Sequence, residues 1–588
     1  MHDWEWHTPS QAWVLHCRLT PDVLPSGSVP AVTDWFVLVS PAYPFGEIKF
    51  CPGKHGGLTA TFPHQKYNFP GRDDAQWRAG SLCLETSAHA FGRRAFSVEP
   101  YEADKRLAWH IRRACQWLED ASRGDLFQPG DPFELPDYPV DESLPFSVAF
   151  AESSDSFSVW NEGPDRVGIV EFFVIRRKFS LHVVKSFLTL KGTRILVPEW
   201  GRAITDEAEL ISRGIWLRMK DTPALDPWQA PTSWGELRTV CKEQGVDLDS
   251  LMRAALGAFR KEDEMGRIAL IGFPIAVRFG ERPERMHWLA IRMPELVAGD
   301  GQARGFRPGR QGAWYHNRER MLRDSVTVNW LRSENWHNDQ LATRGVLPLA
   351  VTSRKILLLG GGALGSAIAE LLARAGVCNL LLVDGDKLEA GNLVRHVLDL
   401  NDLKENKAAA LAKRLNQVTP HGMIEAINAA FPPDRVSERA RLAECDLVID
   451  CTGNDEVIHH LSLFDWKSET LFFSVSMSLG ARRLYCFSAR GLAFPEDAFR
   501  EQIRPWLAKD IEEQSNREMP REGIGCWHPV FPARADDVWL LASVTIKQLE
   551  RAILAPTSEP ALIVFEQFQD ENNFFSGVRQ ASIGADNG

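Results

Sequence analysis

The sequence predicts an α/β protein with a mostly parallel sheet, covered by helices, in its C-terminal half. Apolar runs of strand length alternate there with helical patterns, and this alternation is typical of such a sheet. A glycine-rich loop between the first strand and the first helix is the second observation. The predicted strands are Lys355–Leu359, Asn379–Val383, Leu447–Asp450 and Leu471–Val475, and the predicted helices are Leu364–Ala375, Lys404–Asn416 and Asp455–Leu463.

The glycine-rich loop reads Gly-Gly-Gly-Ala-Leu-Gly and includes Gly360, Gly362 and Gly365. Glycines let the backbone approach a phosphate closely, and the N-terminus of the following helix offers unpaired N–H groups. The second strand ends at Asp384, which is 384 − 365 = 19 residues after the loop. This fits the offset of about 20 residues at which a carboxylate meets ribose hydroxyls. The pattern therefore predicts a nucleotide site.

Residues after the second strand decide between two uses of such a site. Dehydrogenases that transfer a hydride share the loop, but this chain adds Asp386, Asn392, Arg395 and Lys407. Phosphoryl chemistry needs Arg and Lys to neutralise charge on phosphate oxygens, and carboxylates to hold ribose or Mg²⁺. Hydride transfer does not need this set. We therefore predict that the site binds ATP and activates a carboxylate by adenylation.

Five motifs follow one another here: Gly360–Gly365, Asp384-x-Asp386, Asn392-Leu-x-Arg395, Lys407 and Asp450-Cys-Thr-Gly-Asn454. In this order they resemble the ThiF/MoeB and ubiquitin-activating superfamily. The resemblance implies a Rossmann-like adenylation domain that uses ATP and Mg²⁺. It implies that Asp384 holds the ribose and that Asn392 lies beside the phosphates. It also implies that Arg395 and Lys407 stabilise the adenylation transition state.

The last motif departs from the superfamily pattern Asp-x-Thr-Asp-Asn, whose second aspartate helps to hold Mg²⁺. That position is Gly453 here, and we expect its neighbours Asp450 and Asn454 to remain part of the nucleotide site. Either Asp450 or Asp386 holds the metal instead, and we choose Asp450. Alternatively, phosphates and water hold most of the ion, because Mg²⁺ dehydrates reluctantly. A further arginine completes such sites, and the candidates are Arg332 and Arg344.

A cysteine follows these motifs in the segment Gly-Ile-Gly-Cys526-Trp-His528-Pro, ahead of a predicted helix at Asp536–Leu554. An acyl adenylate is a mixed anhydride, and a thiolate is a natural acceptor for its acyl group. His528 and the helix N-terminus favour the thiolate form. The position resembles that of the catalytic cysteine of activating enzymes, which implies the same role for Cys526. A loop thiol without a role is the alternative.

Residues 1–140 are predicted to form a separate α+β domain. Its predicted elements are the strands Trp13–Leu19, Trp35–Val39 and Glu47–Cys51 and a helix from Glu102 to about Ser122. Its motifs are Tyr43-Pro-Phe45, Phe62-Pro-His64 and Gly80-Ser-Leu-Cys83-Leu. These motifs resemble a ubiquitin-conjugating enzyme, which implies that Cys83 is a second catalytic cysteine. A buried thiol is the alternative for Cys83.

The His-Pro-Asn motif of conjugating enzymes is missing from this domain. In that family its asparagine helps the oxyanion or the attacking lysine. His64 is our first candidate to replace it, ahead of Asn68 and His89.

Residues 141–325 are predicted to mix helices and strands. A Pro-rich stretch at residues 128–139 predicts a linker ahead of them. Either a linker or an adenylation-like partner half fits this middle region. Its predicted elements are the strands Gly168–Ile175 and Ile268–Val277 and the helices Ser233–Gly245 and Asp249–Lys261.

Composition excludes several classes of function. The formal net charge of −11 argues against a general nucleic-acid binder. The ten cysteines include no C-x-x-C pair, which argues against a structural zinc site. We find no signal-peptide pattern and no apolar run of the roughly 20 residues that span a membrane. We therefore expect a cytoplasmic protein that binds no membrane.

Together the resemblances imply a bacterial fusion of conjugating and activating enzymes, as in CBASS antiphage systems and bacterial ubiquitin-like conjugation operons. The C-terminal carboxylate of a ubiquitin-like protein or nucleotidyltransferase would pass through Cys526 and Cys83 to a target lysine. The adenylation domain, residues 326–588, implies a homodimer. Two alternatives stay open. One is a sulfur-carrier adenylyltransferase, and the other is a degenerate nucleotide-sensing scaffold, which Gly453 favours.

Overall fold

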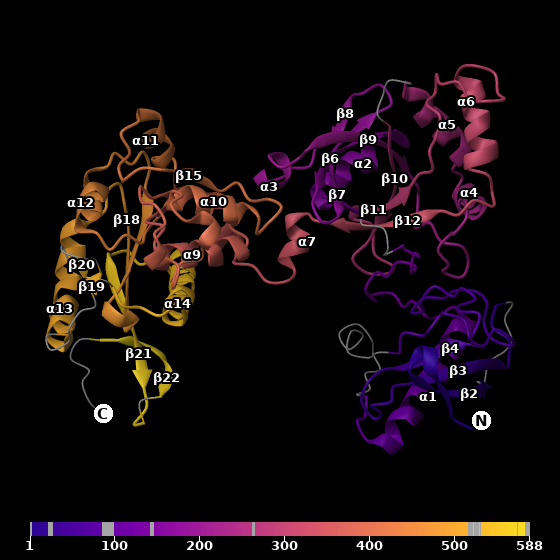
Figure 1. Ribbon diagram of the computed structural model, residues 1–588, viewed down its shortest axis with the longest axis horizontal. Coiled ribbons are helices and arrows are strands. Elements are labelled where there is room, and N and C mark those ends of the chain that lie inside the picture. Colours follow the sequence, from indigo (N-terminus) through magenta and orange to yellow (C-terminus); the bar gives the residue numbers. More distant parts are fainter. Residues whose placement is uncertain are drawn as a thin grey trace. The chain divides into compact units, whose positions relative to one another are not determined.

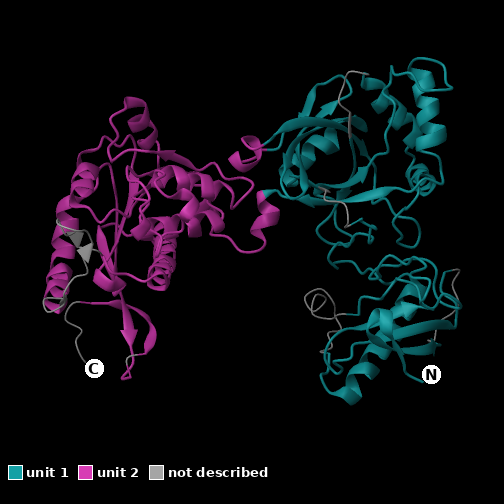
Figure 2. Cartoon of the chain, in the orientation of Figure 1, with its two compact units in different colours: residues 1–198, 208–337 teal, residues 199–207, 338–588 magenta. Residues whose placement is uncertain are grey.

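The computed structural model describes most of the chain as two compact units (Figure 2). The first unit contains residues 1–198 and 208–337, and the second contains residues 199–207 and 338–588. No helix in the described ranges is both long and apolar enough to cross a membrane. Those ranges are 3–20, 28–84, 99–141, 146–260, 265–514, 521–522, 528–529, 531–572 and 574–582.

The second unit is built on an eight-stranded sheet (Figure 1). Its strands are β13 (Ile356–Leu359), β14 (Leu380–Val383), β15 (Glu425–Ile427), β16 (Leu447–Asp450), β17 (Thr470–Met477), β18 (Arg483–Gly491), β21 (Ala561–Gln569) and β22 (Phe575–Ala581). They lie in the order β15-β14-β13-β16-β17-β18-β21-β22. The first five run parallel, and β18, β21 and β22 continue the sheet antiparallel.

Helices cover both faces of this sheet. They include α8 (Leu349–Thr352), α9 (Ala363–Arg374), α10 (Lys407–Asn416), α11 (Val436–Leu442), α12 (Asp455–Leu463), α13 (Glu496–Gln514) and α14 (Ala535–Leu554). The second unit also contains the short helices α3 (Arg202–Thr205) and α7 (Asn338–Ala342). Successive residues of a strand face opposite sides. Ile356 and Leu358 pack with residues of α9 and α14, while Leu357 and Leu359 pack with residues of α12 and α13. Burial on both faces explains the unbroken apolar runs of the parallel strands.

The first unit begins with a four-stranded antiparallel sheet, and a long helix follows it. These elements are β1 (Glu5–His7), β2 (Ala12–Leu19), β3 (Thr33–Val39), β4 (Ile48–Pro52) and α1 (Ala103–Arg123). The buried face of α1, with Ala114, Trp117 and Leu118, packs with Trp35 and Phe50 of the sheet.

The remainder of the first unit contains a closed barrel. Its strands are β5 (Phe146–Phe150), β6 (Val167–Arg176), β7 (Ser180–Thr189), β8 (Arg194–Leu196), β9 (Leu210–Arg218), β10 (Met265–Ile275), β11 (Arg285–Arg292) and β12 (Asn329–Asn335), and its helices include α2 (Ser154–Glu162), α4 (Trp234–Glu243), α5 (Leu248–Ala258) and α6 (Arg310–His316). Because β5 pairs with both β12 and β7, seven strands close into a ring, and β8 pairs beside β7.

The strand and helix predictions are confirmed across both units, with boundaries that shift by up to three residues. The helix predicted from Lys404 begins at Lys407. Lys404 has a φ of +69°, outside the helical region, and the Asn406 side chain caps the helix by accepting from Ala409 N.

A buried carboxylate lies in the barrel. Glu152 is fully buried, and its Oε1 accepts hydrogen bonds from the indole N–H groups of Trp160 and Trp288, at 2.9 and 2.8 Å. Burial raises the pKa of Glu152 from 4.5 to about 7. The folded protein therefore holds this proton more tightly than the unfolded chain. The carboxylate costs stability increasingly as the pH rises from about 4.5 to about 7.

Replacing Glu152 with Gln should stabilise the protein above pH 7, because an amide keeps the acceptor oxygen and carries no charge. The gain at pH 8 is on the order of 3 kcal/mol, and it should shrink toward zero near pH 4.5. Thermal unfolding of variant and wild type at matched pH values measures the difference. A difference that does not change with pH would contradict the assignment.

Candidate active site

The glycine loop joins β13 to α9 at the carboxyl end of the parallel strands. Gly360 has a φ of +85°, which residues with side chains rarely adopt. At Gly365 an added Cβ would lie 1.9 Å from the Gly360 carbonyl oxygen. Only glycine therefore lets α9 begin so close to the strand. At Gly362 an added Cβ would meet no atom within 4 Å, which leaves open space for an anion at the helix N-terminus.

Asp384 and His396 hold the loop between them. Asp384 Oδ2 accepts from Gly361 N at 2.7 Å, and His396 Nε2 lies 2.6 Å from the Gly361 carbonyl oxygen. Leu398 N donates to His396 Nδ1 at 3.1 Å, so Nε2 carries the proton. Burial lowers the pKa of His396, which agrees with a neutral ring. The sequence pattern did not single out His396, although it directly follows Arg395.

Two cations lie close to this loop. Lys407 is the first residue of α10 and only 9% exposed, and its Nζ lies 3.1 Å from Asp386 Oδ2. Arg395 donates to the carbonyl oxygen of Phe531. Asn392 ends a short turn ahead of Arg395. Its side chain stabilises this turn, because Asn392 Oδ1 accepts a hydrogen bond from Glu389 N at 3.0 Å. Arginine and lysine so placed could exchange these partners for phosphate oxygens.

Asp450 ends β16 and is 2% exposed. Its Oδ1 accepts from the backbone N–H and the hydroxyl of Thr452, at 3.1 and 2.6 Å, and its Oδ2 accepts from the Ser474 hydroxyl at 2.8 Å. These donors are neutral, and burial raises the pKa of Asp450. Oδ2 keeps a second lone pair. A cation there would favour the charged carboxylate, so the residues present fit a metal ion at this point.

Gly453 and Asn454 are the last two residues of the Asp450–Asn454 motif, and their roles differ. Gly453 has a φ of +58°, and the nearest atom to an added Cβ is Ser476 Cβ at 3.9 Å. The position therefore has room for the side chain that it lacks. The Asn454 side chain accepts from Glu456 N at 2.9 Å and so caps α12.

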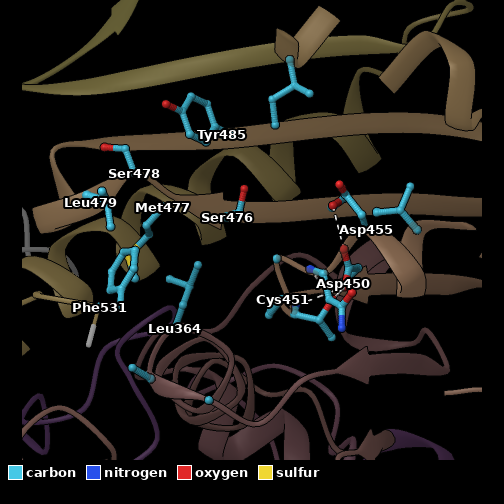
Figure 3. A pocket seen from close by; sticks show the side chains of 18 of the residues that line it. Leu364, Asp450, Cys451, Asp455, Ser476, Met477, Ser478, Leu479, Tyr485 and Phe531 are labelled. Atoms are coloured by element: carbon cyan, nitrogen blue, oxygen red, sulfur yellow. Dashed lines mark hydrogen bonds between the residues drawn. The ribbon is translucent and has the colours of Figure 1, made fainter. Parts of the chain in front are cut away.

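A pocket of about 880 Å³ brings these groups together (Figure 3). Figure 3 shows Asp450 and Cys451 toward one end, with Leu479 and Phe531 toward the other. Asp384 and Asp386 act on the pocket through Gly361 and Lys407, and Gly360 and Gly365 set the path of the loop. The predicted site residues that line the pocket are Gly362, Asn392, Arg395, Lys407, Asp450 and Asn454.

The pocket extends along β18 and α13, which the motifs did not predict to belong to the site. Tyr485 donates to Asp510, and Asp510 pairs with Arg483, which is 1% exposed. The sequence signal for this part of the site was Arg483, a charged residue in the otherwise apolar strand β18. We call this part of the pocket, along β18 and α13, the apolar arm. Its apolar lining residues are Phe499, Ile503, Leu507 and Ile511. An extended peptide segment with apolar side chains fits such a lining.

Cys83 lies in the first unit and is exposed, so the alternative of a buried thiol is wrong. Its N–H donates to the His64 carbonyl oxygen at 2.8 Å. Both residues line one small pocket. Asn68 is 3% exposed, and its amide donates to two backbone carbonyls. Asn68 therefore holds its loop and is not placed to serve Cys83.

The His64 ring is tied on both sides. Its Nδ1 lies 2.5 Å from Glu134 Oε2, and its Nε2 lies 3.2 Å from the Leu126 carbonyl oxygen. Glu134 and the Leu126 carbonyl therefore contact the two nitrogens of the ring from opposite sides. His64 is therefore held in place beside Cys83.

Cys526 lies outside the described residues, as does His89. The described residues that flank Cys526, β19 (Arg521–Glu522) and β20 (His528–Pro529), pair antiparallel. Phe531, five positions after Cys526, lines the pocket. A chain segment of five residues spans at most about 18 Å.

Two alanine variants should separate binding from folding at the loop. Gly365→Ala should lower the thermal midpoint clearly, because overpacking against backbone costs about 1–3 kcal/mol or more. Gly362→Ala should leave the midpoint unchanged and weaken nucleotide binding, measured by calorimetry, at least about tenfold, since its methyl group occupies the space open to a phosphate. Equal effects of the two variants on stability would contradict this geometry.

Asp450→Asn should stabilise the fold and weaken the effect of Mg²⁺ on nucleotide binding. The amide oxygen can still accept from Thr452, and the amide N–H can donate to Ser474, so a buried charge disappears without orphaned groups. We expect a rise of about 2–4 °C in the thermal midpoint and a weaker dependence of nucleotide binding on Mg²⁺. A lower midpoint with unchanged Mg²⁺ dependence would exclude this role for Asp450.

Known proteins match the chain in several parts. The model of the ThiF family matches residues 345–483, and the model of the Cap2 central linker domain matches residues 124–336. Molybdopterin-synthase adenylyltransferase of Haemophilus influenzae is 39% identical over 108 residues, 18% of this chain and 44% of that protein. The ATP-dependent ubiquitin transferase-like protein Cap2 of Pseudomonas aeruginosa is 37% identical over 115 residues, 19% of this chain and 20% of that protein.

One relative matches nearly the whole chain. The ATP-dependent ubiquitin transferase-like protein Cap2 of Enterobacter hormaechei subsp. hoffmannii is 35% identical over 548 residues, which cover 92% of this chain and 90% of that protein. A match of this length includes the glycine loop, the barrel and Cys83. The chain therefore belongs to the Cap2 family of ATP-dependent ubiquitin transferase-like proteins.

Proposed function

We propose that this protein adenylates the C-terminal carboxylate of another protein and passes the acyl group through two cysteines to an amine. The observation that carries the proposal is the single pocket that unites the glycine loop, Arg395, Lys407 and Asp450 with an apolar arm. The loop end suits the phosphates of ATP, and the arm suits an extended protein tail. The carboxylate would then meet the α-phosphate between them.

Positioning and charge neutralisation supply the catalysis in this proposal. The carboxylate attacks the α-phosphorus of ATP, an acyl–phosphate bond forms, and pyrophosphate leaves. Arg395 and Lys407 stabilise the charge that develops on the phosphate oxygens. Asp384 takes the ribose hydroxyls, and Asn392 lies beside the phosphates. Asn454, which caps α12, supports the end of the pocket.

Mg²⁺ belongs to this proposal through Asp450. Among the described residues, no cluster of three or more His, Cys, Asp or Glu could hold a metal ion. Asp450 therefore supplies one protein oxygen, and phosphates and water supply the others, as Mg²⁺ often accepts. When bound there, Mg²⁺ would neutralise negative charge on the phosphates.

The acyl group then moves to thiols. The Cys526 thiolate attacks the acyl carbon, a thioester forms, and AMP leaves. The short chain distance from Cys526 to Phe531 in the pocket supports this step. Exchange with the Cys83 thiolate carries the thioester to the conjugating region, and a lysine amine of the target releases Cys83 and forms an amide.

We propose residues 1–140 as a ubiquitin-conjugating-like domain, residues 141–325 as a middle domain and residues 326–588 as the adenylation domain. The last boundary needs a correction, because β12 pairs within the barrel and residues up to 337 belong to the first unit. The activated partner is a nucleotidyltransferase or a ubiquitin-like protein within antiphage defence of the CBASS type. We also propose a homodimer that works in the cytoplasm without nucleic acid or membrane.

A sulfur-carrier adenylyltransferase is the second candidate, favoured by the match to molybdopterin-synthase adenylyltransferases. That match covers 18% of the chain, and the exposed Cys83 has no use in such an enzyme. A nucleotide-sensing scaffold with no turnover is the third.

Exchange of pyrophosphate into ATP, dependent on the partner's C-terminus, tests the first step. Arg395→Ala and Lys407→Ala should each slow it about 100-fold or more, because each removes charge from the transition state. Lys404→Ala is the matched control, since Lys404 is exposed and pairs with Glu389. No exchange in the wild type would favour the scaffold.

Capture of reducible adducts tests the thiol steps of the same reaction. Cys526→Ala should abolish adducts on both cysteines, whereas Cys83→Ala should leave an adduct on Cys526. If neither substitution removes an adduct, the two-cysteine relay is wrong.

A further inference from the structure

The position of Cys83 is set by a turn that precedes it in the chain. We define the Cys83 turn as residues 61–67. Three hydrogen bonds tie it to residues 80–83: Cys83 N to the His64 carbonyl at 2.8 Å, Lys66 N to the Ser81 carbonyl at 3.0 Å, and Gln65 Nε2 to the Gly80 carbonyl at 3.0 Å. A movement of the turn therefore moves Cys83.

The turn is strained at its centre. His64 has a φ of +57°, in the left-handed region that residues with side chains rarely adopt. Such a conformation costs free energy and persists only where neighbouring groups hold it in place. The neighbours that hold His64 are therefore part of the structure that positions Cys83.

Two carboxylates from residues 125–140 hold the turn. Glu134 is bidentate, because its Oε1 accepts from His64 N at 3.1 Å and its Oε2 lies 2.5 Å from His64 Nδ1. Asp137 Oδ2 accepts from Tyr67 N at 3.0 Å. The Leu126 carbonyl faces the opposite nitrogen of the His64 ring at 3.2 Å. Charged acceptors make these hydrogen bonds stronger than neutral ones.

The same residues 125–140 are anchored to the barrel on their other side. Phe133, Tyr138 and Val140 pack against the apolar layer between the barrel strands and helices α4 and α5. Phe133 N donates to the Val277 carbonyl at 3.1 Å, and the Tyr138 hydroxyl donates to the Pro223 carbonyl at 2.9 Å. The stretch predicted as a linker is thus a strap that joins barrel and turn.

The barrel also reaches the turn directly. Trp228 N donates to the Thr61 carbonyl at 3.1 Å. Phe127 of the strap contacts the Trp228 ring edge to face, with 5.1 Å between centroids, and stacks on Phe279 at 4.9 Å. The turn is therefore gripped at Thr61, His64 and Tyr67 by groups that all belong to residues 124–336, the region matched by the central linker model.

We propose that the strap and the barrel, both within residues 124–336, form a clamp that positions Cys83, and that Glu134 and Asp137 of the strap are its positioning residues. This inference rests on the proposed role of Cys83 in acyl transfer. When a lysine amine attacks the Cys83 thioester, an amide bond forms and the thiolate leaves. The rate depends on holding the carbonyl in an attack geometry, so a loosened turn slows this step and spares adenylation.

The experiment compares three variants of the full chain with the wild type. Glu134→Ala removes both contacts to His64, Glu134→Gln keeps an acceptor for His64 N but loses the charge beside the ring, and Asp137→Asn weakens the grip on Tyr67. Asp74→Asn, an exposed carboxylate of the same domain that pairs with Arg72, is the control. Thermal unfolding checks that each variant is folded.

Two readouts separate the clamp from the proposed function. Hydrogen exchange in peptides covering residues 61–83 should rise in the variants while α1 stays protected, and this needs no activity. Single-turnover release of the acyl group from Cys83 to free lysine should slow about tenfold in Glu134→Ala and less in Glu134→Gln, with loading of Cys526 unchanged, since tenfold corresponds to about 1.4 kcal/mol.

The combination of hydrogen exchange and acyl release decides between the clamp and the proposed transfer. Unchanged exchange in all three variants overturns the clamp, whatever Cys83 does. Raised exchange with an unchanged rate of release overturns the positioning role. If the wild type never loads Cys83 but exchange rises as expected, the clamp stands as structure and the proposed transfer fails. A graded loss, with Glu134→Gln between Glu134→Ala and wild type, supports both.

Discussion

The pocket of the second unit depends on one close approach between two backbone segments. Because Gly365 has no Cβ, α9 begins directly over the Gly360 carbonyl at the end of β13. The same approach presents Gly361 to Asp384 on one side and to His396 on the other. The loop is thus fixed before any ligand arrives, and a fixed loop loses little conformational entropy on binding.

The charges around this loop are arranged for exchange of partners. Lys407 pairs with Asp386, and Arg395 binds a backbone carbonyl, so both cations have partners that phosphate oxygens can replace. Asp450 is in the opposite situation, because it is a buried carboxylate with neutral donors only. These charges fit the proposed ligand, which would bring both phosphates and a cation.

In the first unit, the position of Cys83 is fixed by residues that lie outside the four-stranded sheet β1–β4. The four-stranded sheet and α1 form the core of that domain, but the strained turn at His64 is held by Glu134 and Asp137. These carboxylates are fixed in turn by the packing of Phe133 and Tyr138 on the barrel. The barrel is itself closed by β5, and a closed ring has no free edge that could shift in register.

The sequence by itself determined the features that rest on local pattern. Apolar periodicity located the strands and helices, and the glycine spacing and the offset to Asp384 located the nucleotide loop. The order of Asn392, Arg395 and Lys407 distinguished adenylation from hydride transfer. Only the tertiary structure decided which groups meet across long separations, such as His396 with Gly361, Ser474 with Asp450, and Glu134 with His64. Barrel closure, too, pairs Ser147 of β5 with Arg332 of β12, which lie 332 − 147 = 185 residues apart in the sequence. Periodicity reports what a residue faces within its own element, whereas these contacts depend on how separate elements pack.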